Sequence, residues 1–158
     1  MMREEVQRGL WFEELEEGVR YVHRPGRTIT EGENIQFSAM TMNPQGLHID
    51  SHFAAGEEFG RPLVNSLLTL SIMVGQAVAH LTQGTTVANL GFERVEFPHP
   101  LFPGDTLRTE TVVTGKRLSR SRPGQGIVTF EHTGRNQEGV VVGVAVRSTL
   151  VWCERRET

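Results

Sequence analysis

The longest apolar stretch of the chain covers residues 61–82, and the other segments are arranged around it. Its polar residues are few and it holds no turn signal, so it is too long for one strand and is typical of a helix. Because its apolar positions cover nearly the whole circumference, we expect this helix to be buried. Its start, at residues 64–67, is expected to offer free N–H groups and a positive dipole end that can hold an oxyanion or a polarised carbonyl.

Four segments after this stretch alternate apolar and polar residues as strands do, at residues 87–97, 105–120, 126–133 and 140–152. Turn signals separate them, including two Pro-Gly pairs. Long strands in succession after a buried helix predict the α+β class, with one antiparallel sheet wrapped around one long central helix.

The segments before the central helix are shorter. We expect residues 1–18 to form a surface lead-in held by the aromatic pair Trp11 and Phe12, and residues 19–29 to form an irregular edge strand. Thr30 and Glu33 have the spacing of a capping box, which predicts a helix that starts there. The Asn43-Pro44 pair ends that helix, and a polar loop over residues 43–50 follows before the next short helix.

Composition narrows the classes of function. A chain of 158 residues is expected to form one domain, and its net charge of -3 argues against a general nucleic-acid binder. The single Cys153 excludes an intrachain disulfide and indicates a reduced, cytoplasmic protein. Residues 1–10 do not resemble a signal peptide, and the central stretch is too polar and lacks the charged anchors of a membrane span. Five of the six histidines, apart from His48, show no metal-ligand spacing: His23, His52, His80, His99 and His132. We therefore predict no metal site.

Four short motifs follow one another at fitting distances along the chain. They read TMNPQGLHID at residues 41–50, PLVNSLL at 62–68, LGF at 90–92 and PLFPGD at 100–105. In this order they resemble the MaoC-like hydratases of the hot dog fold, a group that includes the (R)-specific enoyl-CoA hydratases. The chain also resembles the mesaconyl- or itaconyl-CoA hydratase-like branch, which handles short branched dicarboxylic thioesters. The resemblance implies a single hot dog domain over residues 1–158 and a lyase that hydrates or dehydrates an acyl-CoA, with coenzyme A as part of the substrate and no other cofactor.

The chain also departs from the family pattern D-x-N-P-x-H-x-D. Gln45 and Gly46 stand as an insertion between the Asn-Pro pair and the histidine, and the catalytic aspartate of the family falls at Thr41, which cannot act as a carboxylate base. The His-Gly pair at the start of the family's central helix is Asn65-Ser66 here.

Adding water to a double bond conjugated to a thioester needs a base for the water and a donor for the enolate oxygen. His48 can act as the base near neutral pH, and backbone N–H groups around Ser66 can act as the donor. We expect Asn43 to position the water, whereas Asp50 either orients His48 or only caps the next helix. His48 itself has a structural alternative, since a lone histidine in a polar loop is often a surface residue.

Further residues are candidates for binding the substrate. The resemblance leads us to expect Asn65 and Gly91 beside it. Residues 116–122 carry four cations before a Pro-Gly turn, so Arg117, Arg120 and Arg122 either bind the phosphates of coenzyme A or form a solvated hairpin end. Glu93 and Glu96 are expected to be exposed, and serve as the next candidates for a base if His48 is not one.

Two other functions stay open at this point. The first is thioester hydrolysis on the same fold, in which the helix start would stabilise a tetrahedral oxyanion. The second is a non-catalytic thioester-binding or partner subunit, which Thr41 in the aspartate position makes credible. In every case we expect at least a homodimer with a continuous sheet, because a lone sheet of this kind exposes an edge strand and apolar surface.

Overall fold

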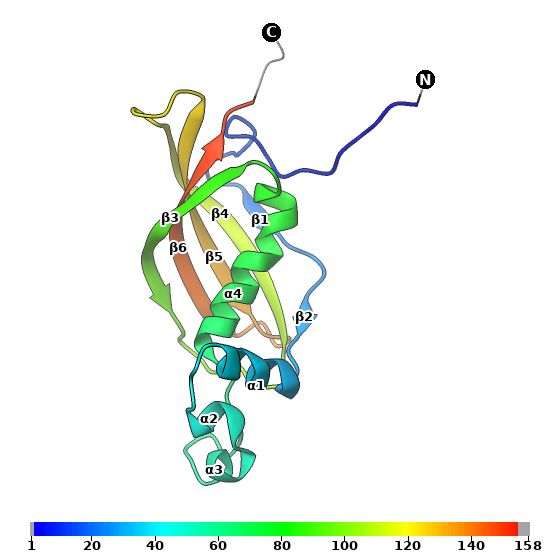
Figure 1. The fold of residues 1–158 in the computed structure, drawn as a ribbon, viewed down its shortest axis with the longest axis vertical. Coiled ribbons are helices and arrows are strands. Elements are labelled where there is room, and N and C mark those ends of the chain that lie inside the picture. The colour runs from blue at the N-terminus through cyan, green and yellow to red at the C-terminus, as the bar shows by residue number, and fades with distance from the viewer. Residues whose placement is uncertain (1, 155–158) are drawn as a thin grey trace.

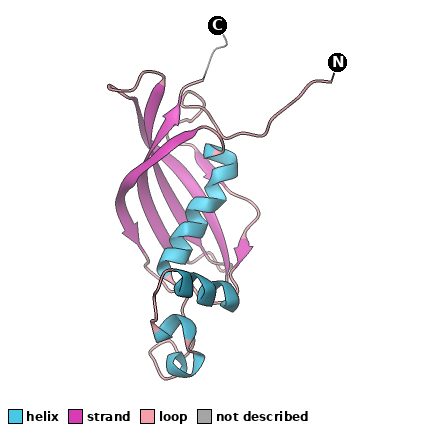
Figure 2. Ribbon diagram, viewed as in Figure 1, coloured by secondary structure: helices cyan, strands magenta, loops and turns pink. Residues whose placement is uncertain are grey.

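The computed structural model describes residues 2–154, in which an antiparallel sheet wraps around one long helix (Figure 1 and Figure 2). The sheet has the order β1-β4-β5-β6-β3, and β2 pairs with β4 beside this path. The strands are β1 (Arg20–Val22), β2 (Arg27–Thr28), β3 (Thr86–Glu96), β4 (Thr106–Leu118), β5 (Gln125–Arg135) and β6 (Val141–Trp152). The four predicted long strands and the predicted α+β class are confirmed, because alternating burial along β4, β5 and β6 turns one face of each strand toward the helix.

The central helix is α4 (Ser66–Ala77), which continues through the π-helical turn η1 (Val78–Thr82). It starts later than the apolar stretch suggested, because residues 62–65 run extended up to Asn65, which caps the helix. The prediction of burial on all sides is wrong on one face, where Leu67 is 56% exposed and Ser71, Gly75 and Ala79 follow it at helical spacing.

The apolar core falls into two clusters, one toward each end of α4. The first includes Val64, Leu68 and Met73, and the second includes Ala77, Leu81 and Phe130. Met73 packs over Gly134 and Gly143 so closely that a Cβ atom at either glycine would lie within 2.8 Å of its sulfur. Glycine at these two places therefore lets the helix approach the sheet.

Three short helices precede α4: α1 (Glu31–Met40), α2 (Gly46–Ile49) and α3 (Ser51–Ala55). In Figure 1, α1 lies across the lower end of α4, and α2 and α3 extend beyond it, away from the sheet. The capping box predicted at Thr30 is confirmed, with the Thr30 and Glu33 side chains each accepting from the other's backbone N–H. The polar loop expected over residues 43–50 is in part the single helical turn α2, because the Gln45 side chain caps it. This turn brings the His48 side chain toward the start of α4.

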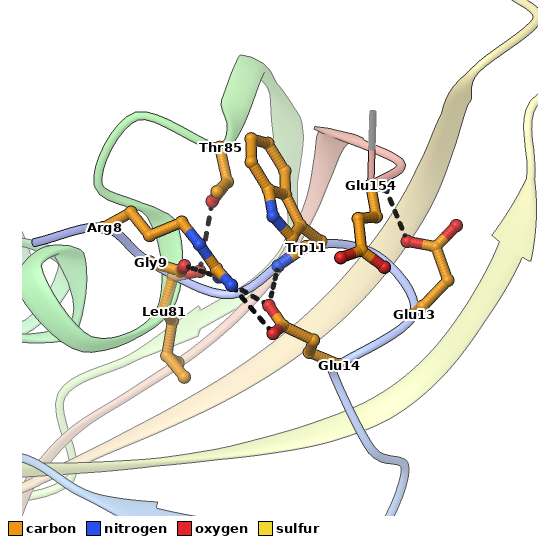
Figure 3. A network of polar contacts seen from close by, with 8 residues as sticks. All are labelled: Arg8, Gly9, Trp11, Glu13, Glu14, Leu81, Thr85 and Glu154. Carbon is orange, nitrogen blue, oxygen red and sulfur yellow. Dashed lines mark hydrogen bonds and ion pairs between the residues drawn. The ribbon is translucent and has the colours of Figure 1, made fainter. Parts of the chain in front are cut away.

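The N-terminal segment, which we expected to lie on the surface, packs into the fold from Gly9 onward. Phe12 and Leu15 are buried, and Phe12 lies over Gly126, where a Cβ atom would come within 2.2 Å of its ring. Arg8 forms two hydrogen bonds with the Glu14 carboxylate, at 2.6 and 2.9 Å, as Figure 3 shows. That pairing lowers the pKa of Glu14, whose carboxylate also accepts from the backbone N–H of Trp11, next to Phe12 in the chain.

Lys116 fastens the same segment from the sheet side. Its ammonium group donates to the backbone carbonyls of Phe12 and Leu15, at 2.9 and 2.6 Å.

Within residues 2–154 no helix has the length and apolar character needed to cross a membrane.

Candidate functional site

A cavity of about 330 Å³ lies at the N-terminal end of α4, between the helix start, α2 and the segment after β3. Apolar side chains make up most of its wall, with His48, Ser66, Thr69 and His99 as the polar ones; the full lining is His48, Phe59, Leu63, Val64, Ser66, Thr69, Phe97, Pro98, His99, Pro100, Leu101 and Val142. No carboxylate is among these residues. An apolar cavity with a few polar groups is the usual form of a small-molecule site.

His48 is half-buried, and its orientation is set by the backbone. Its Nδ1 lies 3.0 Å from the carbonyl oxygen of Leu63, which can only accept a hydrogen bond. The proton of the neutral ring therefore sits on Nδ1, and Nε2 keeps a lone pair that can take a proton. Leu63 thus makes the orienting contact that we had considered for Asp50.

Asn34 of α1 hydrogen-bonds to both backbone segments that make the contact between His48 and Leu63. Its side chain is fully buried and donates from Nδ2 to the carbonyl oxygens of His48 and Leu63, at 3.1 and 2.8 Å. Its Oδ1 accepts from the backbone N–H of Asn65 at 2.7 Å. Sequence reasoning missed this residue, because no local pattern marks an asparagine whose partners lie 14 to 31 positions away.

Two backbone N–H groups at the start of α4, those of Ser66 and Leu68, have no acceptor among the described residues, and of these two residues only Ser66 lines the cavity. The Asn65 side chain accepts from Leu67 N–H at 3.0 Å, and the Asn65 carbonyl accepts from Thr69 N–H at 3.1 Å. Among the described residues no acceptor faces the backbone N–H of Ser66, which lines the cavity. Asn65 is therefore a buried cap, whereas the Ser66 amide is available to an oxyanion.

His99 is the second histidine of this cavity, and the sequence analysis had not singled it out. It stands between Pro98 and Pro100, and its Nδ1 lies 3.0 Å from the carbonyl oxygen of Val141. It therefore has the same tautomer as His48, with Nε2 free to exchange a proton. No spacing in the sequence links residues 48 and 99, so only the folded chain brings them to one cavity.

The remaining residues of the histidine motif lie outside the cavity wall. Asp50 caps α3, since its Oδ1 accepts from the backbone N–H groups of His52 and Phe53 at 3.0 and 2.9 Å. Asn43 accepts from Gln45 N–H at 3.1 Å in the turn before α2. The Thr41 hydroxyl donates to the Phe37 carbonyl at the end of α1, which is a structural role.

The other candidates lie away from His48. Gly91 forms an irregularity of β3 with φ at 147°, and Glu93 and Glu96 are exposed on the same strand. Arg117 is at the end of β4, and Arg120 and Arg122 are exposed in the hairpin that follows, at the end of the sheet opposite α2 (Figure 1). In one copy of the chain these arginines therefore do not reach the cavity at the start of α4.

Two histidines are buried elsewhere, under the middle of α4. Burial lowers the pKa of His23 to about 4 and that of His132 to about 3, and the Arg147 charge adds to the effect on His132. Within the part of the chain that the structure describes, no three His, Cys, Asp or Glu side chains are grouped so as to hold a metal ion.

Comparison with known proteins matches residues 14–136 to the MaoC like domain. The mesaconyl-CoA hydratase of Cereibacter sphaeroides is 31% identical over 95% of this chain and 43% of its own length. The beta-methylmalyl-CoA dehydratase of Chloroflexus aurantiacus is 32% identical over 90% of this chain and 40% of its own length. The chain thus spans about two fifths of these relatives.

A solved structure from Mycobacterium tuberculosis, the conserved protein RV0216 with a double hot dog fold, superposes with a TM-score of 0.84 at 25% identity. The match covers 95% of this chain and 46% of that one. The predicted hot dog fold is confirmed.

Proposed function

This chain belongs to the MaoC-like domain family, and we propose that it adds water to, or removes water from, the double bond of an enoyl-CoA thioester. The observation that carries the proposal is the placement of His48 with its Nε2 free, in one cavity with the unpaired Ser66 N–H. These are the base and the oxyanion donor that such a reaction needs.

In the direction of hydration, His48 Nε2 takes a proton from water while the water oxygen bonds to Cβ of the enoyl group. The electron pair of the double bond moves toward the thioester, and the negative charge develops on its carbonyl oxygen. The Ser66 N–H donates to that oxygen, with the positive end of the α4 dipole behind it. A donor of this kind contributes on the order of 100-fold or more to the rate.

The reaction is completed by a proton that reaches Cα. In the D-x-N-P-x-H family pattern a carboxylate accompanies the histidine, but none lines this cavity. His99 is the one other titratable side chain of its wall, and in its protonated form it donates from Nε2 to Cα. His48 then holds one proton more and His99 one fewer, and exchange with solvent restores both.

The substrate class follows from the relatives named for mesaconyl-CoA and beta-methylmalyl-CoA. Both names denote short, branched acyl groups with a second carboxylate. A cavity of about 330 Å³ suits a short acyl group better than a long one.

The site is expected to need a second hot dog unit. Among the described residues β3 pairs with β6 alone, so no strand of residues 2–154 pairs with its outer edge. Apolar side chains along and just after β3 are exposed: Leu90, Phe92, Val95 and Phe97. An unpaired edge with apolar neighbours favours pairing with another strand. We propose that a second copy of the chain, or a second unit in a longer protein, pairs antiparallel along β3. A two-fold axis at this edge would bring the hairpin of Arg120 and Arg122 toward the other unit's cavity, where coenzyme A phosphates could bind.

The test is an assay of the purified chain with crotonyl-, mesaconyl- and itaconyl-CoA, in which enoyl absorbance and free thiol are followed separately. Loss of absorbance without thiol release supports the hydratase. Thiol release would instead identify a thioesterase, and neither signal across the panel would identify a binding subunit. Light scattering on the same sample checks the assembly, and the mass of one chain at micromolar concentration would contradict the paired sheet.

A further inference from the structure

Arg61 stands at the rim of the cavity that holds His48. It is two residues from Phe59 and two from Leu63, and both of these line the cavity. The guanidinium carbon of Arg61 lies 3.6 Å from the centre of the Phe102 ring, and that ring meets the Phe59 ring at 6.1 Å between centroids. Arg61, Phe102 and Phe59 therefore form one stack that ends in the cavity wall.

Backbone contacts fix this stack relative to the start of α4. The N–H of Val64 donates to the carbonyl of Leu101 at 2.8 Å, which joins the segment that carries Arg61 to the segment that carries Phe102. The N–H of Phe102 donates to the Asp105 side chain at 2.9 Å. The ring on which the guanidinium rests is thus held in place by the fold.

Stacking uses only the face of the guanidinium group. At 3.6 Å its plane has to lie along the Phe102 ring, because an N–H group directed at the ring would collide with it. The N–H groups then point outward in that plane, where they can bind a carboxylate or a phosphate with two parallel hydrogen bonds. Within residues 2–154 the Arg61 side chain forms no hydrogen bond and no ion pair, so these donors are free.

The acidic side chains around Arg61 do not neutralise it. Glu57 and Glu58 are exposed in the same loop, and neither forms an ion pair with Arg61 among the described residues. The Asp105 carboxylate is engaged elsewhere and accepts from the Gln137 side chain at 2.8 Å. Because no carboxylate lines the cavity, the charge of Arg61 adds to the positive end of the α4 dipole.

We propose that Arg61 binds an anionic group of the substrate, and this inference rests on the hydratase function proposed above. The anion is either the second carboxylate of the acyl group or a phosphate of coenzyme A. No lysine or arginine lines the cavity, so His48 and Ser66 act on the double bond and the carbonyl while Arg61 takes the charge at the rim. Arg61 belongs to the same chain as His48, so this contact does not depend on a second hot dog unit.

The experiment is a calorimetric titration of the purified chain with three saturated thioesters, which have no double bond to hydrate: butyryl-pantetheine, butyryl-CoA and methylsuccinyl-CoA. The first carries no anionic group, the second carries phosphates, and the third carries phosphates and a carboxylate. In Arg61→Gln the dissociation constant of methylsuccinyl-CoA should rise by about 10-fold or more, because a charge-assisted hydrogen bond is lost. That of butyryl-pantetheine should not change.

The response to butyryl-CoA identifies the anion. An equal rise for butyryl-CoA and methylsuccinyl-CoA would assign the contact to a phosphate, and a rise for methylsuccinyl-CoA alone would assign it to the carboxylate. In turnover of the matching enoyl thioester, the same variant should raise KM and leave kcat nearly unchanged, because the contact is the same in the ground state and the transition state.

The matched control is Arg24→Gln, which removes another exposed arginine that has no ion pair within residues 2–154. Arg24 lies beside Gln76 and Ala79, about 15 Å along α4 from Ser66, so this variant should bind all three thioesters as the parent does. Both arginines are exposed, so both variants should keep the thermal midpoint of the parent.

Three results would overturn the proposal. They are weaker binding of butyryl-pantetheine by Arg61→Gln, which would show that the side chain only supports the wall; equal effects of Arg61→Gln and Arg24→Gln; and no binding by the parent protein. Because these probes bind without reacting, turnover of enoyl thioesters tests the hydratase separately. An active parent with unchanged binding in Arg61→Gln would contradict this inference alone, whereas the expected binding pattern without turnover would contradict only the hydratase.

Discussion

The side-chain oxygen of Asn34 accepts a 2.7 Å hydrogen bond from the backbone N–H of Asn65, and so ties α1 to the residue that caps α4. The same asparagine donates to the carbonyls of His48 and Leu63. One buried amide therefore fixes the distance between the proposed base and the proposed oxyanion donor. Only an amide can do so, because the position requires two donors and one acceptor.

Asn34→Asp is expected to lower the free energy of unfolding by about 2–4 kcal/mol, because a carboxylate oxygen would then face two carbonyl oxygens in a buried place. Urea unfolding followed by circular dichroism measures this. The matched control is Gln36→Glu, the same amide-to-acid change at an exposed position of α1. Similar losses in both variants would show that the buried contacts of Asn34 do not stabilise the site.

His48→Gln is expected to reduce kcat by about 100-fold or more, because general-base catalysis contributes on that scale. The thermal midpoint should stay close to that of the parent, since the ring is only half-buried. His52→Gln, at an exposed position of α3, serves as the control and should keep its activity. Near-normal turnover of His48→Gln on the true substrate would show that His48 is not the base, and Glu93 and Glu96 would be the next candidates.

His99→Gln is expected to lower kcat by about 10-fold or more with little change in KM, because glutamine keeps the size but cannot deliver a proton. Incorporation of solvent deuterium at Cα of the product gives an independent measure of the same step. A change in KM alone would show that His99 binds the substrate and does not transfer the proton.

Asp50→Ala is expected to lose about 1 kcal/mol of stability, which is the usual contribution of an N-cap, whereas Asp50→Asn keeps the accepting oxygen and should lose little. Both variants should turn over normally when folded. The comparison uses thermal unfolding and kcat on the same samples. A slow but fully stable Asp50→Asn would instead support a role in orienting His48.

Stability is expected to fall as the pH is lowered from 7.5 to 5.5, because burial depresses the pKa of His23 to about 4 and of His132 to about 3. The unfolded chain takes up protons near the ordinary histidine pKa of about 6.5, while the folded chain does not until the pH is far lower. Stability is therefore complete above pH 6.5 and is lost below it, by at most about 1.4 kcal/mol per pH unit for each of the two histidines.

Urea midpoints at pH 7.5, 6.5 and 5.5 measure this slope, and the window stays above the range in which most carboxylates titrate. His132→Gln should flatten the slope, since one of the two depressed groups is gone. A midpoint that does not change over this range would mean that the two histidines take up protons at the same pH in the folded chain as in the unfolded chain.

The elements of the fold were predictable because they depend on local patterns. The alternation of apolar and polar residues predicted β4 to β6, and the spacing of Thr30 and Glu33 predicted the start of α1. The one-turn helix α2 was missed, because its Gln45 cap has no strong sequence signature. Predicting a helix buried on all sides failed because small and apolar residues such as Gly75 and Leu67 occupy its open face as well.

The site was predictable only in part, for the same physical reason. His48 and Ser66 lie in two of the motifs quoted above, which α3 and the loop after it separate. Asn34, His99 and the buried His132 act through contacts between distant parts of the chain, such as the 42-residue separation of His99 and Val141. Such contacts carry no period or spacing that a single sequence displays.

The packing of Phe12 over Gly126 bears on where this protein can be cut. The match to the MaoC like domain begins at residue 14, so a shortened protein that started there would lack Phe12 and keep the bare glycine surface of β5 that its ring covers. Lys116 would lose its carbonyl acceptor at Phe12 as well, and its ammonium group would stand beside an opened core. The boundary of the folded unit is therefore set by the contact between Phe12 and Gly126, and it lies several residues before the match to the family domain starts.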